Sequence, residues 1–254
     1  MTQDQYVNDV IQRHKLPEKM DTFTEKNIVI PLKQVISNWA GSCLCEIKLS
    51  GSRAKGTAID ISTDLDLFIS LSSTTNISLE EIYDSLYERM VEEGFKARKQ
   101  NVSIGITYLG RKIDLVPARR QSQYGNDHSL YKRKDNSWTK TNIDTHICHV
   151  RKSGRIREIV ALKIWRENHG LSFPSIYMET YAIESLRGRS MNAPADNFIY
   201  LLKDIHDNLN VRQIVDPANS NNILSDELSL TEKKVLQKKA GESIQEQYWS
   251  NIIW

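Results

Sequence analysis

The sequence predicts an α+β fold with a mixed β-sheet in its first half and helices in its second half. Apolar and polar residues alternate over 44–49 and again over 64–71, which is the period of a half-buried β-strand. After residue 155, apolar residues instead recur at helical spacing in several successive segments. The organisation is therefore a mixed-sheet lobe followed by a helical lobe, with a helical segment at the front.

Length and composition restrict the class of protein. At 254 residues the chain can form one large domain or two lobes that share a cleft, and 39% hydrophobic with 26% charged residues excludes a disordered or fibrous chain. Apolar runs such as IVAL at 159–162 are far shorter than the roughly 18 residues of a membrane-spanning helix, and the start does not resemble a signal peptide. We expect a cytoplasmic protein with no membrane partner. Cys43, Cys45 and Cys148 lack the spacing of a structural zinc site, and we interpret them as buried thiols.

The front of the chain and the first two strands surround a turn. Residues 1–40 show helical spacing and are expected to form a supporting layer. The strand over 44–49 runs into Gly51-Ser52, and the strand over 64–71 begins after a turn-rich stretch. The two strands therefore flank a Gly-Ser pair and a segment, RAKGTAI, that can open a short helix.

A helix and further short strands complete the sheet lobe. Ser78 and Glu81 form a capping box at the start of a helix over about 79–93. Two or three short strands are expected within FKARKQ, VSIGITYL and KIDLVPA, the last of which contains Asp114. The polar region 118–154 receives no assignment.

Helices account for the second half of the chain. They are predicted at IREIVALKIWREN, at SIYMETYAIESL, at DNFIYLLKDIHDNL, and after a second capping box that runs from Ser229 to Glu232. The chain contains no internal repeat and no low-complexity linker.

Two acids interrupt what otherwise looks like a buried strand. Asp64 and Asp66 are two residues apart, so their side chains share one strand face and repel each other unless a cation lies between them. Magnesium prefers a few carboxylates with phosphate oxygens and retained water, so the pair suits half of a phosphate-processing metal site. A solvated edge strand is the alternative interpretation of the two acids alone.

A third acid strengthens the metal interpretation. Asp114 lies in the strand-like run RKIDLVPA. Three acids on adjacent strands can hold two metal ions about 3.5 to 4 Å apart, one activating an attacking hydroxyl and the other neutralising a leaving pyrophosphate. Alternatively, Asp114 is a buried acid paired with an arginine.

The Gly51-Ser52 pair suggests a phosphate contact. Glycine lets the backbone approach a ligand closely, and the amides and hydroxyl of such a turn can cradle a phosphate. An ordinary turn is the alternative, and the chain contains neither a P-loop nor a G-x-G-x-x-G motif.

These residues together resemble the signature of the DNA polymerase beta-like nucleotidyltransferase superfamily. The matching elements are Gly51-Ser52, eleven intervening residues, Asp64-Leu65-Asp66 and the later Asp114. The wider stretch GSRAKGTAIDISTDLDLF is most similar to the bacterial cGAS/DncV-like nucleotidyltransferases (CD-NTases), the cyclic oligonucleotide synthases of CBASS anti-phage systems. It is also similar to oligoadenylate synthetases and archaeal-type CCA-adding enzymes.

The resemblance covers roughly residues 40–225 and implies a domain organisation. It implies a polymerase beta-like catalytic lobe over 41–150 and an oligoadenylate synthetase-like helical lobe over 151–254, with the active site in the cleft between them. Residues 1–40 would form leading helices that pack on both lobes.

The resemblance also implies nucleotide-binding residues in both lobes. It assigns Gly51 and Ser52 to the nucleotide, and Lys163 in ALKIW and Ser175 at the start of the next helix to the triphosphate. An unpaired Lys163 in an apolar run is costly to bury, which suits an anion, although its stem can instead extend to solvent. Ser175 also suits a simple helix N-cap.

Two further assignments concern the base. Tyr177 is a candidate for base stacking, although an aromatic at this helical spacing also suits the core. VDPANSNNI resembles a DP-x-N-x-x-N loop near the base, in which Asp216, Asn219 and Asn222 either contact the base edge or stabilise the loop. His146 loosely matches a phosphate-contacting histidine of CCA-adding enzymes.

The function implied is a signalling cyclase. With two Mg²⁺ ions on Asp64, Asp66 and Asp114, for which Mn²⁺ can substitute, it would join nucleoside triphosphates such as ATP into a cyclic di- or oligonucleotide and release pyrophosphate. We expect a monomer. The roughly 30 residues after the Asn-rich loop are too few for the tail domain expected of a CCA-adding enzyme.

Two alternatives remain open. Residues 111–157 contain twelve Lys or Arg against four Asp, which suits RNA as an optional partner and hence a linear oligoadenylate synthetase-like or tRNA 3′-end enzyme. The second alternative is an inactive member of the fold that senses nucleotide or RNA, although the presence of all three acids argues against it.

Overall fold

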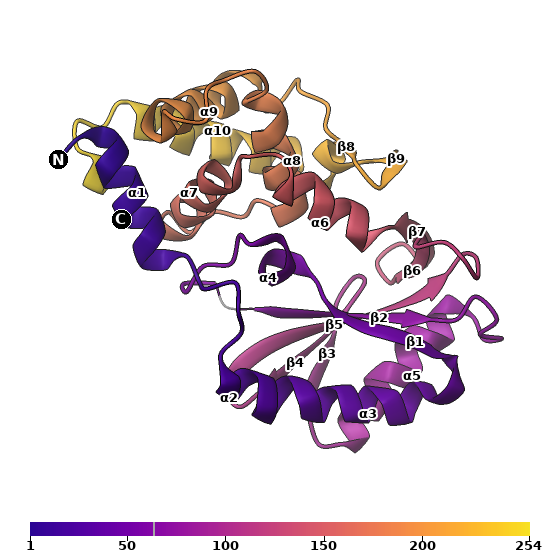
Figure 1. The fold of residues 1–254 in the computed structure, drawn as a ribbon. Coiled ribbons are helices and arrows are strands. Elements are labelled where there is room, and N and C mark those ends of the chain that lie inside the picture. Colours follow the sequence, from indigo (N-terminus) through magenta and orange to yellow (C-terminus); the bar gives the residue numbers. More distant parts are fainter. Residues whose placement is uncertain (63) are drawn as a thin grey trace. The chain divides into compact units, whose positions relative to one another are not determined.

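The computed structural model describes residues 1–62 and 64–254 (Figure 1). The chain forms two compact units and passes between them several times. Unit 1 comprises Met1–Leu16, Gly56–Ser62 and Cys148–Trp254; unit 2 comprises Pro17–Lys55 and the described residues up to Ile147. Each unit has an extensive apolar core of its own.

Unit 2 is built on a mixed β-sheet, which confirms the predicted α+β class. In the described part of the chain its strands are β1 (Leu44–Leu49), β2 (Leu65–Leu71), β3 (Lys96–Lys99), β4 (Ile104–Tyr108), β5 (Arg111–Arg120), β6 (His128–Lys132) and β7 (Ser137–Thr141). The main path is β1-β2-β5-β4-β3, and β6 pairs with both β5 and β7. Strands β2 and β5 are parallel, and the other pairs are antiparallel.

Helices of unit 2 cover one face of this sheet. Its helical segments are α2 (Thr22–Thr24), the π-helical η1 (Glu25–Val29), α3 (Ile30–Ala40), the 3-10 turn η2 (Gly41–Cys43), α4 (Gly51–Lys55) and α5 (Leu79–Glu92). The predicted capping box of Ser78 opens α5. Helices α3 and α5 pack against the face that carries Leu67 and Ile69 (Figure 1). Because side chains alternate along a strand, Asp66 and Phe68 lie on the opposite face.

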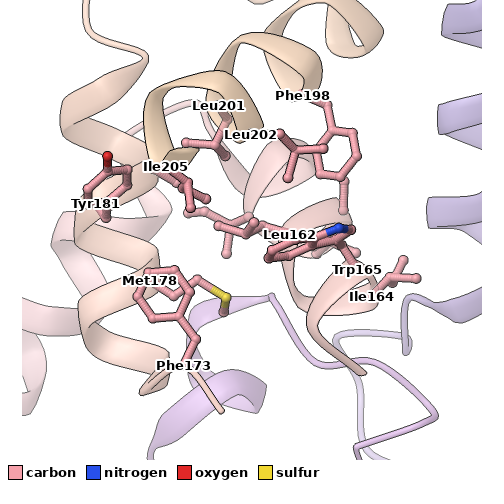
Figure 2. Close-up of a cluster of buried hydrophobic side chains, with 14 of the residues drawn as sticks. Leu162, Ile164, Trp165, Phe173, Met178, Tyr181, Phe198, Leu201, Leu202 and Ile205 are labelled. Atoms are coloured by element: carbon pink, nitrogen blue, oxygen red, sulfur yellow. The ribbon is translucent and has the colours of Figure 1, made fainter. Parts of the chain in front are cut away.

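Unit 1 is mainly helical and is centred on one helix. Helix α6 (Ile143–Arg151) begins in unit 2 and ends in unit 1. The other elements of unit 1 are α1 (Gln3–His14), α7 (Ile156–Asn168), α8 (Ser175–Ser185), α9 (Pro194–Asn208), β8 (Val215–Asp216), β9 (Asn219–Ile223), η3 (Leu224–Glu227), α10 (Leu230–Ile244) and η4 (Trp249–Asn251). Helix α7 is buried on all sides from Glu158 to Trp165, which is typical of a core helix. Figure 2 shows Leu162 and Trp165 of α7 among apolar side chains of α8 and α9.

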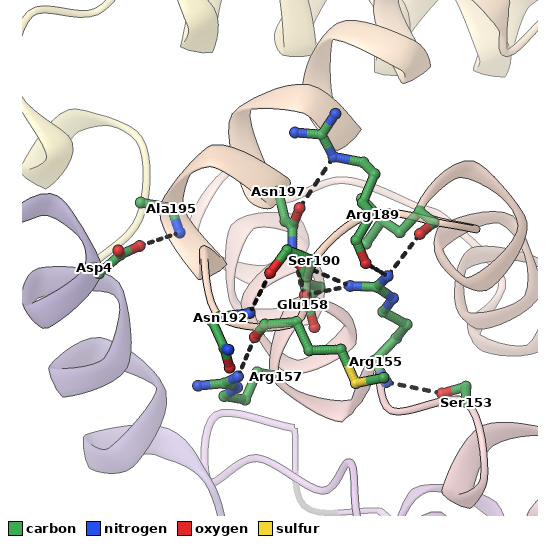
Figure 3. A network of polar contacts seen from close by, with 12 residues as sticks. Asp4, Ser153, Arg155, Arg157, Glu158, Arg189, Ser190, Asn192, Ala195 and Asn197 are labelled. Carbon is green, nitrogen blue, oxygen red and sulfur yellow. Dashed lines mark hydrogen bonds and ion pairs between the residues drawn. The ribbon is translucent and has the colours of Figure 1, made fainter.

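A buried polar network anchors a loop to the start of α7 (Figure 3). The guanidinium of Arg155 donates to Oε1 of Glu158 at 3.2 Å and to the backbone carbonyl of Leu186 at 2.7 Å. Asn197 donates to the same Glu158 oxygen at 2.8 Å and to the carbonyl of Ser190 at 2.7 Å. Buried charges require such partners, so the network holds the segment between α8 and α9 in place.

Two features differ from the sequence-based expectations. The unassigned region 118–154 contains β6, β7 and the whole of α6. The interpretation of the cysteines as buried thiols is wrong, because Cys45 and Cys148 are exposed and Cys43 is half-buried. The pairing of β1 with β2 is irregular between Leu44 and Glu46, which leaves Cys45 outside the regular register.

The structure also bears on the membrane. Across residues 1–62 and 64–254, no helix combines the length and the apolar composition that crossing a membrane requires.

Candidate active site

The Gly-Ser turn lies directly against an acid of the neighbouring strand. Gly51 begins α4 with a φ of +56°, a left-handed conformation that favours glycine. A Cβ atom at this position would lie 1.7 Å from Oδ2 of Asp66, so any other residue would displace that carboxylate. The N–H of Ser50 donates to the backbone carbonyl of Asp66 at 2.9 Å, and Ser52 lies half-buried in α4. The contact with Asp66 therefore requires the glycine.

Asp66 and Asp114 lie side by side on neighbouring strands. The parallel register of β2 and β5 pairs them directly, so both carboxylates project from the sheet face opposite α3 and α5, at a strand spacing of about 4.8 Å. Asp64 directly precedes β2 and is exposed. Its negative charge is one of the causes that raise the pKa of Asp114. The structure thus gathers the three predicted acids in unit 2, with Asp64 at the rim.

Asp114 has a neutral hydrogen-bond partner. Nε2 of Gln100 donates to Oδ1 of Asp114 at 2.7 Å. This contact passes over Gly105, which is paired with Asp114 between β4 and β5. A Cβ atom at position 105 would lie 2.3 Å from Nε2 of Gln100 and 2.9 Å from Nε of Arg98, so only glycine leaves room for these side chains. Burial raises the pKa of Asp114 above its usual range, the charge of Asp64 adds to this, and the Gln100 hydrogen bond and nearby cations oppose it. Gln100 holds one carboxylate oxygen and so sets the direction of the other.

A cavity of about 150 Å³ lies within unit 2 beside the turn. Its walls include Gly51, the buried Lys55 and His146. Phe68 and Val116 also line it, and each lies two residues beyond an acid on the same strand face. The cavity therefore continues the carboxylate face of the sheet and combines apolar walls with basic side chains.

The predicted triphosphate residues Lys163 and Ser175 lie in unit 1. Lys163 is 2% exposed, and its Nζ donates to the backbone carbonyl of Thr57 at 3.0 Å, so its side chain does not extend to solvent. The hydroxyl of Thr57 donates to the buried Glu179 at 3.3 Å. Ser175 is the first residue of α8, and its hydroxyl accepts a hydrogen bond from Arg166 at 3.2 Å. Lys163 therefore holds the segment Gly56–Ser62, and its phosphate contact stays a prediction.

The predicted base residues Tyr177 and Asn222 also have partners within unit 1. Tyr177 is fully buried, and its ring meets Phe173 edge-on at 5.0 Å. Asn222 donates to Oδ2 of Asp216 at 3.0 Å, while Oδ1 of Asp216 accepts from the N–H of Ala218 at 2.8 Å. These contacts favour the core and loop-stabilising interpretations, and base contacts stay predictions.

Solved structures share this architecture. The chain is similar to CdnC of E. coli MS115-1, solved with ATP, at a TM-score of 0.72 and 18% identity over 95% of this chain and 90% of that chain. It is similar to the CD-NTase CdnG of Bradyrhizobium diazoefficiens, solved with GTP, at a TM-score of 0.79 and 12% identity over 96% and 91%. The Cid1 poly(U) polymerase, bound to MgATP, has a TM-score of 0.66 and 12% identity over 96% and 95%. The chain has the fold of the polymerase beta-like nucleotidyltransferases.

The likeness lies in the fold more than in the sequence. No protein-family model and no curated protein matches the chain. The nucleotidyltransferase fold nevertheless extends over nearly the whole chain and includes CD-NTases, which confirms the predicted resemblance at the level of the fold.

The acids of this nucleotidyltransferase fold suit a divalent metal ion. Asp66 and Asp114 present carboxylate oxygens, the ligands that Mg²⁺ prefers, from neighbouring strands. Burial and the neighbouring charge of Asp64 make the ionised form of Asp114 less favourable, which raises its pKa. A bound cation would stabilise the ionised carboxylates. Across residues 1–62 and 64–254, no three His, Cys, Asp or Glu side chains are already arranged to hold a metal. Because Mg²⁺ commonly combines one or two carboxylates with phosphates and water, the pair is sufficient to hold it with a nucleotide.

Sequence reasoning missed Gln100 and Gly105. The sequence did contain a signal for Gly105, because an isolated glycine within an alternating run such as VSIGITYL indicates that another group approaches the backbone closely. Gln100 carries no such signal, because only the pairing of β3, β4 and β5 brings it to Asp114.

Proposed function

We propose that the protein is a magnesium-dependent nucleotidyltransferase that joins nucleoside triphosphates, ATP among them, into a cyclic di- or oligonucleotide and releases pyrophosphate. One observation carries the proposal: Gly51 packs on Asp66, and Asp114 lies beside it. A turn whose backbone can approach phosphates thus adjoins carboxylates that suit a divalent ion. The likeness to CD-NTases, one of them solved as a cyclic dinucleotide synthase, supports a cyclic product. The proposal includes a role of this product as a second messenger in anti-phage signalling, and a monomeric enzyme in the cytoplasm.

The proposed reaction is a displacement at phosphorus. The ribose hydroxyl oxygen of one nucleotide forms a bond to the α-phosphorus of a second nucleotide. The bond between this α-phosphorus and the oxygen that bridges the α- and β-phosphorus atoms breaks, and pyrophosphate leaves. The hydroxyl proton passes to water. A second transfer of the same kind closes a ring.

The residues of unit 2 have separate roles in this proposal. The turn at Gly51 would orient the phosphates of the donor nucleotide. Asp66 and Asp114 would hold the metal, which supplies activation of the hydroxyl and neutralises the leaving pyrophosphate. Gln100 would keep the Asp114 carboxylate in its orientation.

A linear product is the second candidate function. Cid1, a poly(U) polymerase, shares the fold, so the fold alone does not select a cyclic product. The basic stretch 111–157 also suits RNA, as in an oligoadenylate synthetase-like or tRNA 3′-end enzyme. Both candidates use the same acids, and only the product separates them.

Substitution of Asp66 tests the catalytic assignment. Asp66→Ala removes one carboxylate of the pair, and we expect pyrophosphate release to fall by a factor on the order of 10³ or more with an unchanged circular dichroism spectrum. Asp135→Ala, at an exposed acid of the same unit, should leave release unchanged. Release that persists in the folded Asp66→Ala protein would contradict the assignment.

Product analysis separates the candidates. The protein is incubated with each labelled nucleoside triphosphate, with and without an RNA oligonucleotide, in Mg²⁺ or Mn²⁺, and the products are treated with phosphatase and weighed by mass spectrometry. Phosphatase-resistant cyclic products support the cyclase, and linear products or labelled RNA ends support the second candidate. No incorporation from any triphosphate would indicate an inactive sensor.

A further inference from the structure

A groove of about 440 Å³ lies on the surface of unit 1. Its walls are formed by the neighbouring helices α9 and α10 (Figure 1), by the start of α1 and by residues that follow α10. The volume is within the range of about 300 to 1,000 Å³ that is typical of ligand pockets. Every described residue that lines the groove belongs to unit 1, so none of the acids proposed for catalysis contributes to it.

Much of the groove is lined by apolar side chains that the protein covers only in part. Ile199, Ile244 and Trp249 are half-buried and pack against the core of unit 1. Tyr200 is 38% exposed, and the guanidinium of Arg189 lies over its ring at 4.0 Å. Trp, Tyr and Arg are the residue types that are enriched at the strongest contacts of protein interfaces. The lining therefore suits an aromatic side chain of a partner.

The charged residues that line the groove are both acids. Among the described residues, neither Asp196 nor Glu246 takes part in an ion pair, whereas Glu242, on α10, has Nζ of Lys239 at 2.5 Å. Nδ2 of Asn251 donates to Oε2 of Glu246 at 2.9 Å. Asp196 lies in the first turn of α9, where an acid favours the helix, but this reason does not apply to Glu246.

The two acids restrict what can cover the groove. A molecule that covers it removes two carboxylates from water, which is costly unless cations pair with them. Nucleotides, RNA and anionic lipids are negatively charged and would be repelled. An aromatic side chain flanked by Lys or Arg would fill the apolar part of the groove, and its flanking cations would pair with the acids.

We propose that this groove is a docking site for a partner protein, and that it binds an aromatic side chain flanked by Lys or Arg in an exposed segment of that partner. Tyr200 and Trp249 would contact the aromatic ring, and Asp196 and Glu246 would pair with the flanking cations. The inference goes beyond the proposed function, because none of these residues is proposed to bind nucleotide or metal.

Three short peptides test the chemistry of the groove. The acetylated and amidated peptide KKWKK carries the aromatic side chain and the cations. EEWEE keeps the aromatic side chain and reverses the charge, and KKGKK keeps the charge without the aromatic side chain. Each peptide is titrated into the isotope-labelled protein without nucleotide, and amide NMR signals report both the affinity and the residues that are affected.

The unmodified protein should bind KKWKK with a Kd at least about 10-fold lower than its Kd for EEWEE or KKGKK. The largest shifts should fall on the amides of Asp196, Tyr200 and Glu246 and on the indole of Trp249. Equal affinities for KKWKK and either of the other peptides, or shifts centred on another surface, would overturn the inference.

Variants with matched controls test the two parts of the groove separately. D196N/E246Q should bind KKWKK at least about 10-fold more weakly, whereas D135N/E88Q, at exposed acids of unit 2, should bind it as the unmodified protein does.

For the aromatic part, Y200S should also weaken the binding of KKWKK, whereas Y124S, at a tyrosine of unit 2 that is 93% exposed, should not. Unchanged signals elsewhere in each spectrum show that the variant is folded. A folded D196N/E246Q that keeps the full affinity for KKWKK would overturn the inference, whatever the outcome for pyrophosphate release.

Discussion

At the scale of the residue, the contact between Gly51 and Asp66 links the turn to the acids. Two independent constraints act at this position: the backbone has a φ of +56°, and the space of a Cβ atom is filled by a carboxylate oxygen. A side chain here would therefore strain the backbone and also displace an acid. The two effects can be separated by experiment.

Gly51→Ala should disable the site beyond its effect on stability. Gly110 is the matched control, because its φ is +75° and nothing lies within 4 Å of the Cβ position. Both substitutions should lower the free energy of unfolding by about 1 to 2 kcal/mol through left-handed strain. Only Gly51→Ala should also reduce pyrophosphate release, by about 10²-fold or more, because the displaced Asp66 no longer faces Asp114. Similar kinetics for the two variants would show that the Asp66 contact is not needed for activity.

Gln100→Leu should affect turnover more than binding. The substitution removes the hydrogen bond that orients Asp114, so we expect kcat to fall by about 10-fold with little change in KM for the nucleotide. Gln121→Leu is the control, because the Gln121 amide instead donates to Ser129 at 3.1 Å. Steady-state rates of pyrophosphate release measure both constants. A change confined to KM would contradict the positioning role.

The sequence revealed part of the site at this scale. Asp64, Asp66 and Asp114 stand out because acids are unexpected in apolar strands, and Gly51 because it ends a strand next to a serine. Gln100 is an ordinary polar residue after a short strand, and its role depends on where Gly105 leaves space across β4. No local pattern encodes that arrangement.

At the scale of the element, β6 carries a buried histidine. Nδ1 of His128 donates to the carbonyl of Asn126 at 2.8 Å, so Nε2 is left to accept from the Ser70 hydroxyl at 2.8 Å. Burial lowers the pKa of His128 below its usual 6.5, and the nearby Arg120 cation acts in the same direction. The folded protein therefore favours neutral His128.

The stability of unit 2 should consequently fall in mild acid. Because the pKa of His128 is lowered on folding, the unfolded chain binds the proton more readily than the folded chain does. The contribution of neutral His128 to the free energy of unfolding is therefore present above pH 6.5 and is lost as the pH falls towards the folded-state pKa. Each unit of pKa depression corresponds to about 1.4 kcal/mol. Urea unfolding measured between pH 7.5 and pH 5 should show that the free energy of unfolding decreases as the pH falls. In His128→Gln this dependence on pH should be weaker. The exposed His206→Gln is the control, and a slope equally shallow in all three proteins would contradict the assignment.

Elements with local signals were the ones that could be predicted. The capping boxes at Ser78 and Ser229 open α5 and α10, and the helical spacing of IREIVALKIWREN coincides with α7. β7 has the sequence SWTKT and is mostly exposed or half-buried, so it lacks the alternation that identifies a strand. It forms because β6 pairs with it along its whole length.

At the scale of the whole molecule, each unit depends on its own core. Leu162 is fully buried among α7, α8 and α9, and Leu162→Ala should lower the free energy of unfolding by about 2 to 5 kcal/mol. Val235 on α10 is 55% exposed, so Val235→Ala should change it by less than about 0.5 kcal/mol. Chemical denaturation followed by fluorescence measures both, and equal effects would contradict the central position of α7.

By itself, the sequence determined most of the helices, though not α6, together with the paired acids Asp64 and Asp66 and the turn beside them, because these depend on residues a few positions apart. Only the tertiary structure decided that β2 and β5 are parallel neighbours, that Asp66 faces Asp114, and that Gly56–Ser62 belongs to unit 1. It also brought Arg98 into the row of Asp114 from a strand distant in sequence. The physical reason is that local spacing determines which face a side chain occupies, whereas strand order and register depend on how the complete core packs.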